Sequence, residues 1–301
     1  MKTVCFLGDS ITQLGYWIAE VFEYLKKDGI RIYNCGVGGD CAAKALSRLY
    51  ADCLCRTPDT VVIMFGVNDI GIHLYTENPT EAQKTMQAEC MSIYQNSIRE
   101  LTEKIQRSGI DIILCTPTPY NDRTPATVPL SKANDGLAEC ASFILSLAAE
   151  LSVPCVDFFN ALRPMLGGLF QTMDDRIHPT QEGQHIMAQL FLLQLGFIDD
   201  MDLRPFSIPA GSAQKRFDIE HTLSIIRFVE WNSLYSERMK KTLKHEDYIS
   251  LTKDLLAEAK KSGDKKRIQW YTEYLDTVEK WQELNAELVR LTLEMNSSEL
   301  S

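Results

Sequence analysis

Two short motifs, one near the start of the chain and one far along it, carry residue types that could cleave an ester. Gly8-Asp9-Ser10 places a hydroxyl directly after an apolar run, and Asp175 precedes His178 by three positions. Hydrolysis through a serine needs a nucleophile, a base that takes its proton, a group that orients the base, and donors for the oxyanion. The motifs predict Ser10 as nucleophile, His178 as general base and Asp175 as the orienting carboxylate.

Two further turns could supply the oxyanion donors. In the segment 34–40, three glycines leave the backbone free to approach a substrate, and the N–H of Gly39 is the donor we expect. In Gly66-Val67-Asn68-Asp69, the carboxamide of Asn68 can donate a hydrogen bond without carrying charge. The sequence therefore contains a candidate for every part of such a site.

Each of these motifs also has an ordinary structural explanation. A Gly-Asp-Ser turn can cap a helix, a glycine cluster can be a tight turn, and a single Asp-x-x-His is commonly a surface hydrogen bond. Asp9 and Asp69 are expected to cap turns and fix loops, and Asp174 is an alternative to Asp175 whose offset from His178 fits less well. The motifs gain specificity from their order and from the elements they follow.

Short apolar runs alternate with longer amphipathic segments up to about Gly196. The strands we predict are 3–8, 31–35, 60–65, 111–116 and 154–157, and the helices are 16–27, 42–51, 80–108, 131–151 and 180–195. This alternation predicts a three-layer α/β/α sandwich around a parallel sheet. Three of the motifs follow the first three strands, so they should meet at the carboxyl edge of the sheet.

After about Leu203 the composition shifts toward Lys, Glu and Leu. We predict a hydrolase-like domain over 1–199, a linker over 200–218 and an all-helical appendage over 219–301, with a helix-breaking turn at Gly263 and Asp264. An apolar stripe marks the last helix: Tyr271, Leu275, Val278, Leu284, Leu288, Leu291 and Met295. The stripe either packs within a helical hairpin or onto the sandwich, or forms the seam of a homodimer.

Charge and cysteine content restrict the possible partners. The net charge of −10, from 31 basic and 41 acidic side chains, argues against nucleic acid. The apolar run after Met1 ends at Gly8, so we expect no signal peptide or membrane span and a cytoplasmic protein with reduced cysteines. No metal or cofactor is expected, and His185 is expected to be an exposed or capping histidine and not a metal ligand.

Taken together, residues 3–195 resemble the GDSL, or SGNH, hydrolase family. Its blocks are similar to Gly8-Asp9-Ser10-Ile11, where the family pattern has Leu for Ile11, to Asn34 through Gly39-Asp40, to Gly66-Val67-Asn68-Asp69, and to Asp175-x-x-His178. The resemblance implies a flavodoxin-like sheet of strand order 2-1-3-4-5. It also implies the roles above for Ser10, His178 and Asp175, with the N–H of Ser10, the N–H of Gly39 and Asn68 forming the oxyanion hole.

The expected function is that of a serine esterase acting on small O-acyl groups, such as acetyl on a carbohydrate. A lysophospholipase or a thioesterase would use the same mechanism. A non-catalytic binding module that recruits a partner through the helical tail is an alternative from another class. A nucleotide-binding protein ranks last, because the turn at Gly36 to Gly39 lacks the Lys-Ser/Thr of a phosphate loop.

Overall fold

The computed structural model describes residues 2–25, 28–123, 132–203, 229, 245–280, 283, 284 and 287. By its contacts the chain divides into two units, Met1–Leu49 with Pro58–Leu203 and Tyr50–Thr57 with Arg204–Ser301. Most of the predicted linker over 200–218 lies outside the described residues, and so does much of the predicted appendage over 219–301. The division into domains stays a prediction.

The first unit is built on a five-stranded parallel sheet of order β2-β1-β3-β4-β5, as predicted. The strands are β1 (Thr3–Gly8), β2 (Arg31–Gly36), β3 (Thr60–Met64), β4 (Asp111–Cys115) and β5 (Cys155–Val156). In the register, Leu7 of β1 lies opposite Cys35 of β2 and Ile63 of β3. Because helices cover both faces, β1 reads as a continuous apolar run, and its Leu7 is fully buried.

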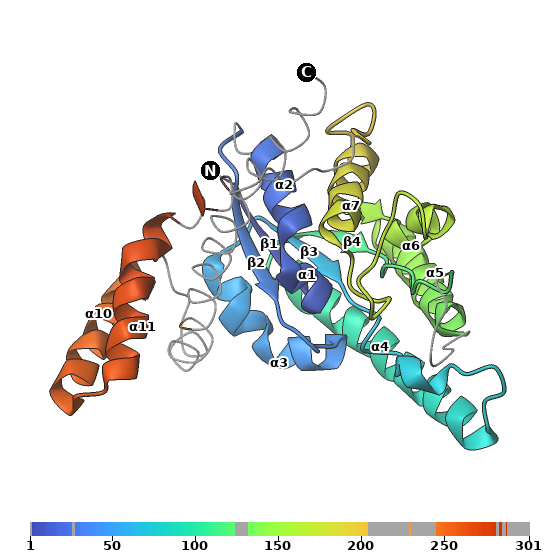
Figure 1. Cartoon of the computed structure of the whole chain (residues 1–301), viewed down its shortest axis with the longest axis horizontal. Helices are drawn as coiled ribbons and strands as arrows, with labels where there is room; N and C mark the ends of the chain where they lie inside the picture. The colour runs from blue at the N-terminus through green and yellow to red at the C-terminus, as the bar shows by residue number, and fades with distance from the viewer. Residues whose placement is uncertain are drawn as a thin grey trace. The chain divides into compact units, whose positions relative to one another are not determined.

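Helices pack on both faces of this sheet (Figure 1). They are α1 (Ser10–Leu14), α2 (Tyr16–Leu25), α3 (Ala42–Asp52), α4 (Glu81–Arg107), α5 (Ala133–Leu151), α6 (Phe158–Leu162) and α7 (Gln181–Gln194). Helices α2 and α7 lie side by side on one face, and α4 and α5 pack together on the opposite face (Figure 1). The predicted three-layer α/β/α sandwich is confirmed.

Local capping residues explain why the starts of α4 and α7 were predicted accurately. Thr80 caps α4 through a reciprocal pair of bonds with Gln83, and Thr180 caps α7 by accepting from the N–H of Gly183. The prediction was wrong at β5, which is two residues long because Asp157 already caps α6. Helices α1 and α6 were missed, since five residues are too few to show a helical period.

An aromatic cluster holds α2 and α7 against β1. The ring of Trp17 lies 5.2 Å from that of Phe6 and 5.7 Å from those of Phe158 and Phe191, measured between centroids. Edge-to-face contacts of this kind add to the burial of the rings themselves. The cluster holds β1 in place, and Ser10 follows the end of this strand by two residues.

The second unit contains a helical hairpin of α10 (His245–Ser262) and α11 (Lys265–Thr277), followed by the short η5 (Val278–Lys280). The predicted turn is present, because Gly263 has a φ of +70° and Asp264 caps α11. Tyr271 and Val278 of the apolar stripe are buried. Apart from Leu284, the stripe beyond residue 280 lies outside the described residues. No helix within the described ranges has the length and apolar character required to cross a membrane.

Candidate active site

Ser10 stands at the carboxyl end of β1, where it begins α1. The carboxylate of Asp9 accepts the N–H of Ile11 at 2.9 Å and caps this short helix. A side chain at Gly8 would place a Cβ atom 2.0 Å from Oγ1 of Thr12. A glycine at this position therefore allows α1 to fold back closely over the end of the strand and to present the Ser10 hydroxyl at the sheet edge.

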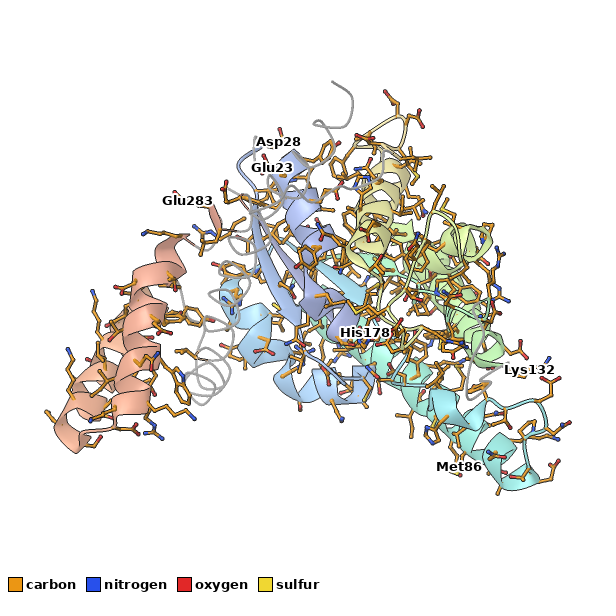
Figure 2. The ribbon with its side chains drawn as sticks, in the orientation of Figure 1. Glu23, Asp28, Met86, Lys132, His178 and Glu283 are labelled. Carbon is orange, nitrogen blue, oxygen red and sulfur yellow. The ribbon has the colours of Figure 1, made fainter. Side chains whose placement is uncertain are left out.

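His178 reaches Ser10 from the loop before α7. Its Nε2 lies 2.7 Å from Oγ of Ser10, although the two residues are 168 positions apart. Its Nδ1 lies 2.5 Å from Oδ2 of Asp175. Figure 2 shows His178 at the edge where the strands of the sheet end. With Nδ1 donating to the carboxylate, Nε2 is left to accept the hydroxyl proton of Ser10.

The loop that carries Asp175 and His178 is held in place by its own backbone. Oδ1 of Asp175 accepts the N–H groups of Ile177 and His178, both at 2.9 Å. Arg176, which directly follows Asp175, adopts a left-handed conformation with φ of +66°. Its carbonyl accepts the N–H of Asn121 at 3.0 Å. Partial burial raises the pKa of Asp175, but the hydrogen bonds from His178 and Ile177 outweigh it and leave that pKa below its ordinary value.

The turns that contain Gly39 and Asn68 are joined to each other. Nδ2 of Asn68 donates to the carbonyl of Asp40 at 2.9 Å, and Oδ1 of Asp69 accepts the N–H of Ala42 at 2.8 Å. Gly39, with φ of +70°, precedes Asp40. A carboxamide carries two N–H donors, so the bond to Asp40 leaves one of them for a second acceptor. The structure thus brings the turns of Gly39 and Asn68 to the same edge as Ser10.

Comparison with known proteins identifies the family. A model of the GDSL-like lipase/acylhydrolase family matches residues 6–186. The chain belongs to this family. As a GDSL-like hydrolase it is a carboxylic ester hydrolase, and the match includes Ser10, Gly39, Asn68, Asp175 and His178. The match ends before the helical hairpin of the second unit.

Several GDSL-like relatives and other solved structures share this fold. An acetylxylan esterase from Geobacillus stearothermophilus is 26% identical over an alignment of 217 residues, and the alignment covers 65% of this chain and 94% of the esterase. Its structure matches with a TM-score of 0.53 at 25% identity, covering 65% of this chain and 95% of that one. A gut microbial diltiazem-metabolizing enzyme gives a TM-score of 0.58 at 24% identity, with 65% of this chain and 47% of that enzyme covered. This chain therefore spans about half the length of that last enzyme.

Buried charges under the site were not foreseen from the sequence. Three aspartates, Asp9, Asp40 and Asp69, directly follow Gly8, Gly39 and Asn68 of the motifs. The guanidinium of Arg48 forms a buried ion pair with Asp40. Burial raises the pKa of Asp9 to about 6 and the pKa of Asp69 to about 7. The sequence did contain one signal of these buried charges, because an aspartate recurs in the turn after each of three neighbouring strands. In hydrogen bonding, Asp9 and Asp69 behave as the expected capping and loop-fixing residues.

Replacing Asp69 by asparagine should stabilise the fold at alkaline pH. The pKa of this carboxyl is raised from 3.8 to about 7 because it is buried, and its Oδ2 lacks a hydrogen-bond partner among the described residues. The folded state therefore binds this proton more tightly than the unfolded state does. As a result, the free energy of unfolding falls as pH rises from about 4 toward 7. An asparagine stays neutral and can still accept the N–H of Ala42. We expect Asp69→Asn to raise the free energy of unfolding at pH 8 by roughly 1–3 kcal/mol.

Urea unfolding at pH 5 and pH 8 measures this effect. The gain should be present at pH 8 and much smaller at pH 5, where the wild-type carboxyl is already protonated. The exposed Asp111 provides the matched control, Asp111→Asn, which should show no such dependence. An equal effect of Asp69→Asn at both pH values would contradict the account of its burial.

His185 is not the exposed or capping residue that the sequence predicted. Only 3% of this residue is exposed, and its Nδ1 lies 2.9 Å from Oε1 of Glu20 on α2. Its Nε2 lies 2.6 Å from the carbonyl of Asp202, which can only accept. Burial lowers the pKa of His185, but the bond with Glu20 and the other negative groups outweigh it, so that pKa is raised. In the described part of the chain, no three His, Cys, Asp or Glu side chains are grouped to hold a metal ion.

Proposed function

We propose that the chain hydrolyses esters through an acyl-enzyme, with Ser10 as nucleophile, His178 as general base and Asp175 as its orienting carboxylate. The observation that carries this proposal is the continuous contact from Oγ of Ser10 to Nε2 of His178, at 2.7 Å, and from Nδ1 of His178 to Asp175, at 2.5 Å. Hydrogen-bond distance between nucleophile and base is the geometric requirement for proton transfer.

The reaction follows from these contacts. Oγ of Ser10 attacks the ester carbonyl carbon while its proton passes to Nε2 of His178, and Asp175 stabilises the imidazolium. The carbonyl oxygen becomes an oxyanion, for which the N–H of Ser10, the N–H of Gly39 and Nδ2 of Asn68 are the proposed donors. Collapse of this intermediate releases the alcohol, which takes the proton from His178. Water then attacks the acyl-serine by the same route in reverse.

Named variants of a relative agree with these roles. Three structures of the Geobacillus acetylxylan esterase are described as catalytic mutants, and they replace a serine, an aspartate and a histidine by alanine. The aspartate and histidine are three positions apart in that esterase, as Asp175 and His178 are here. This equal spacing supports the assignment of both residues.

For the substrate we propose a small O-acyl group, such as acetyl on a carbohydrate. The name of the acetylxylan esterase relative supports a carbohydrate acetyl ester, at 26% identity. Hydrolysis of 4-nitrophenyl esters from acetyl to decanoyl tests this substrate class, with the rate of Ser10→Ala subtracted as background. We expect kcat/KM to be highest for acetyl and to fall by at least about tenfold by octanoyl. A preference for the long members would favour a lysophospholipase instead, and faster cleavage of the acetyl thioester would favour a thioesterase.

The proposal also includes the location of the protein and the role of its C-terminal helical region. We propose a cytoplasmic esterase. We also propose that its C-terminal region mediates a homodimer, because the apolar stripe predicted from the sequence extends from Tyr271 to Met295. Light scattering of the intact chain measures its mass directly. A single 34.2 kDa chain in solution would remove the dimer from the proposal and leave the esterase untouched.

A further inference from the structure

One buried cation under the site has no part in the proton transfers described above. Arg48 lies on α3, and only 2% of it is exposed. A guanidinium keeps its charge in any environment, so its burial is costly unless every donor is used. The contacts of Arg48 therefore show what its burial achieves.

Those contacts converge on the backbone that leads to Ser10 and Gly39. Nε and Nη2 of Arg48 contact Oδ2 of Asp40 at 2.6 Å and 2.5 Å. Nη1 donates to the carbonyl of Cys35 at 2.7 Å, and Nη2 donates to the carbonyl of Gly8 at 3.0 Å. Gly8 ends β1 two residues before Ser10, and Asp40 directly follows Gly39. A single rigid group thus links the ends of β1 and β2 to the turn between β2 and α3.

The third proposed donor is linked through the same aspartate. The carboxylate of Asp40 is held by Arg48, while its carbonyl accepts Nδ2 of Asn68 at 2.9 Å. Asn68 lies after β3, so the network crosses three neighbouring strand ends. Displacing Asp40 should therefore move Gly39 and Asn68 together.

We infer that Arg48 is a positioning residue that fixes the proposed oxyanion donors of Ser10, Gly39 and Asn68 relative to one another through Gly8 and Asp40. The inference rests on the proposed function, since it concerns the oxyanion of that reaction. Arg48 does not touch the reacting atoms. Its planar fork serves three acceptors at once, which the single ammonium of a lysine cannot reproduce.

Arg48→Lys is the principal test, because it keeps the charge and removes the fork. We expect kcat for 4-nitrophenyl acetate to fall about 10- to 100-fold with little change in KM, since the donors serve the transition state. The affinity for a phenylboronic acid, which forms a tetrahedral adduct on a catalytic serine, should fall by a similar factor. A simple loss of stability would not weaken the adduct selectively in the folded enzyme.

A double-mutant cycle with Asn68→Ala makes the test specific. Asn68→Ala alone should cost about 10²- to 10³-fold in kcat, as expected for one lost oxyanion donor. If Arg48 acts through the same donors, the loss in the double variant should be clearly smaller than the product of the two single losses. Independent losses that multiply would overturn the inference.

Two further variants keep the test decisive. Glu20→Gln disrupts the buried contact with His185 elsewhere in the same unit, so it controls for the loss of a buried ion pair. The kcat of this variant should stay within about threefold of wild type.

If Arg48→Lys does not fold, Asp40→Asn weakens the same link and should show the same loss of kcat and of boronate affinity. Wild-type kcat and boronate affinity in the folded Arg48 and Asp40 variants would refute the positioning role alone. Absence of ester hydrolysis by the wild-type enzyme would instead refute the proposed function.

Discussion

Replacing Ser10 by alanine should lower kcat for 4-nitrophenyl acetate by about 10⁴- to 10⁶-fold while the protein stays folded. The reason is that, in the proposed mechanism, the oxygen of Ser10 is the protein atom that bonds to the acyl carbon. Its hydroxyl is half-buried and lies 2.7 Å from Nε2 of His178, and an alanine removes only this one oxygen, so the nucleophile is lost with little loss of packing. Steady-state hydrolysis and circular dichroism of the purified variant measure both parts of this expectation.

The matched control is Ser47→Ala, an exposed serine on α3 whose hydroxyl bonds to the carbonyl of Lys44. It should retain the wild-type kcat within about threefold, since surface substitutions of this kind have small effects. A Ser10→Ala enzyme that hydrolyses the ester at the wild-type rate would show that another group is the nucleophile. The family membership would then stand and the mechanism would not.

Replacing Asp175 by asparagine should lower kcat by about 10³- to 10⁴-fold. An asparagine can still accept the N–H groups of Ile177 and His178 through its oxygen, so the loop should keep its shape. Its NH₂ group would then face Nδ1 of His178 in place of the carboxylate oxygen. Nδ1 would have to accept, the ring proton would move to Nε2, and Nε2 could no longer take the proton of Ser10.

Asp174→Asn controls for charge in the same loop and also tests the alternative orienting group. Asp174 is exposed, and its removal should change kcat by less than about threefold. A large loss in Asp174→Asn together with a small loss in Asp175→Asn would reverse the assignment of the two aspartates.

The sequence predicted the parts of this molecule that local signals determine. Thr80 and Thr180 cap helices through residues three positions away, so both helix starts could be placed to within one residue. The alternation of strands and helices predicted the layers, because each element repeats its pattern over many residues. The motifs could be assigned to one edge of the sheet, since parallel strands all end there.

The features that were missed depend on contacts between distant segments. Glu20 and His185 are 165 residues apart, and neither has a local pattern that marks the other as its partner. Arg48 resembles any basic residue of an amphipathic helix until the folded chain brings the carbonyls of Gly8 and Cys35 to it. Helix α1 exists because Asp9 caps it, and its sequence alone has no helical period.

Labelling with a fluorophosphonate, followed by peptide mapping, tests whether Ser10 is an activated nucleophile. Such a probe reacts with an activated serine and forms a covalent bond to its oxygen. We expect one adduct per chain, located on Ser10, and no labelling of Ser10→Ala. Wild-type protein that stays unlabelled, or that carries its adduct on another residue, would contradict the role of Ser10 as the nucleophile.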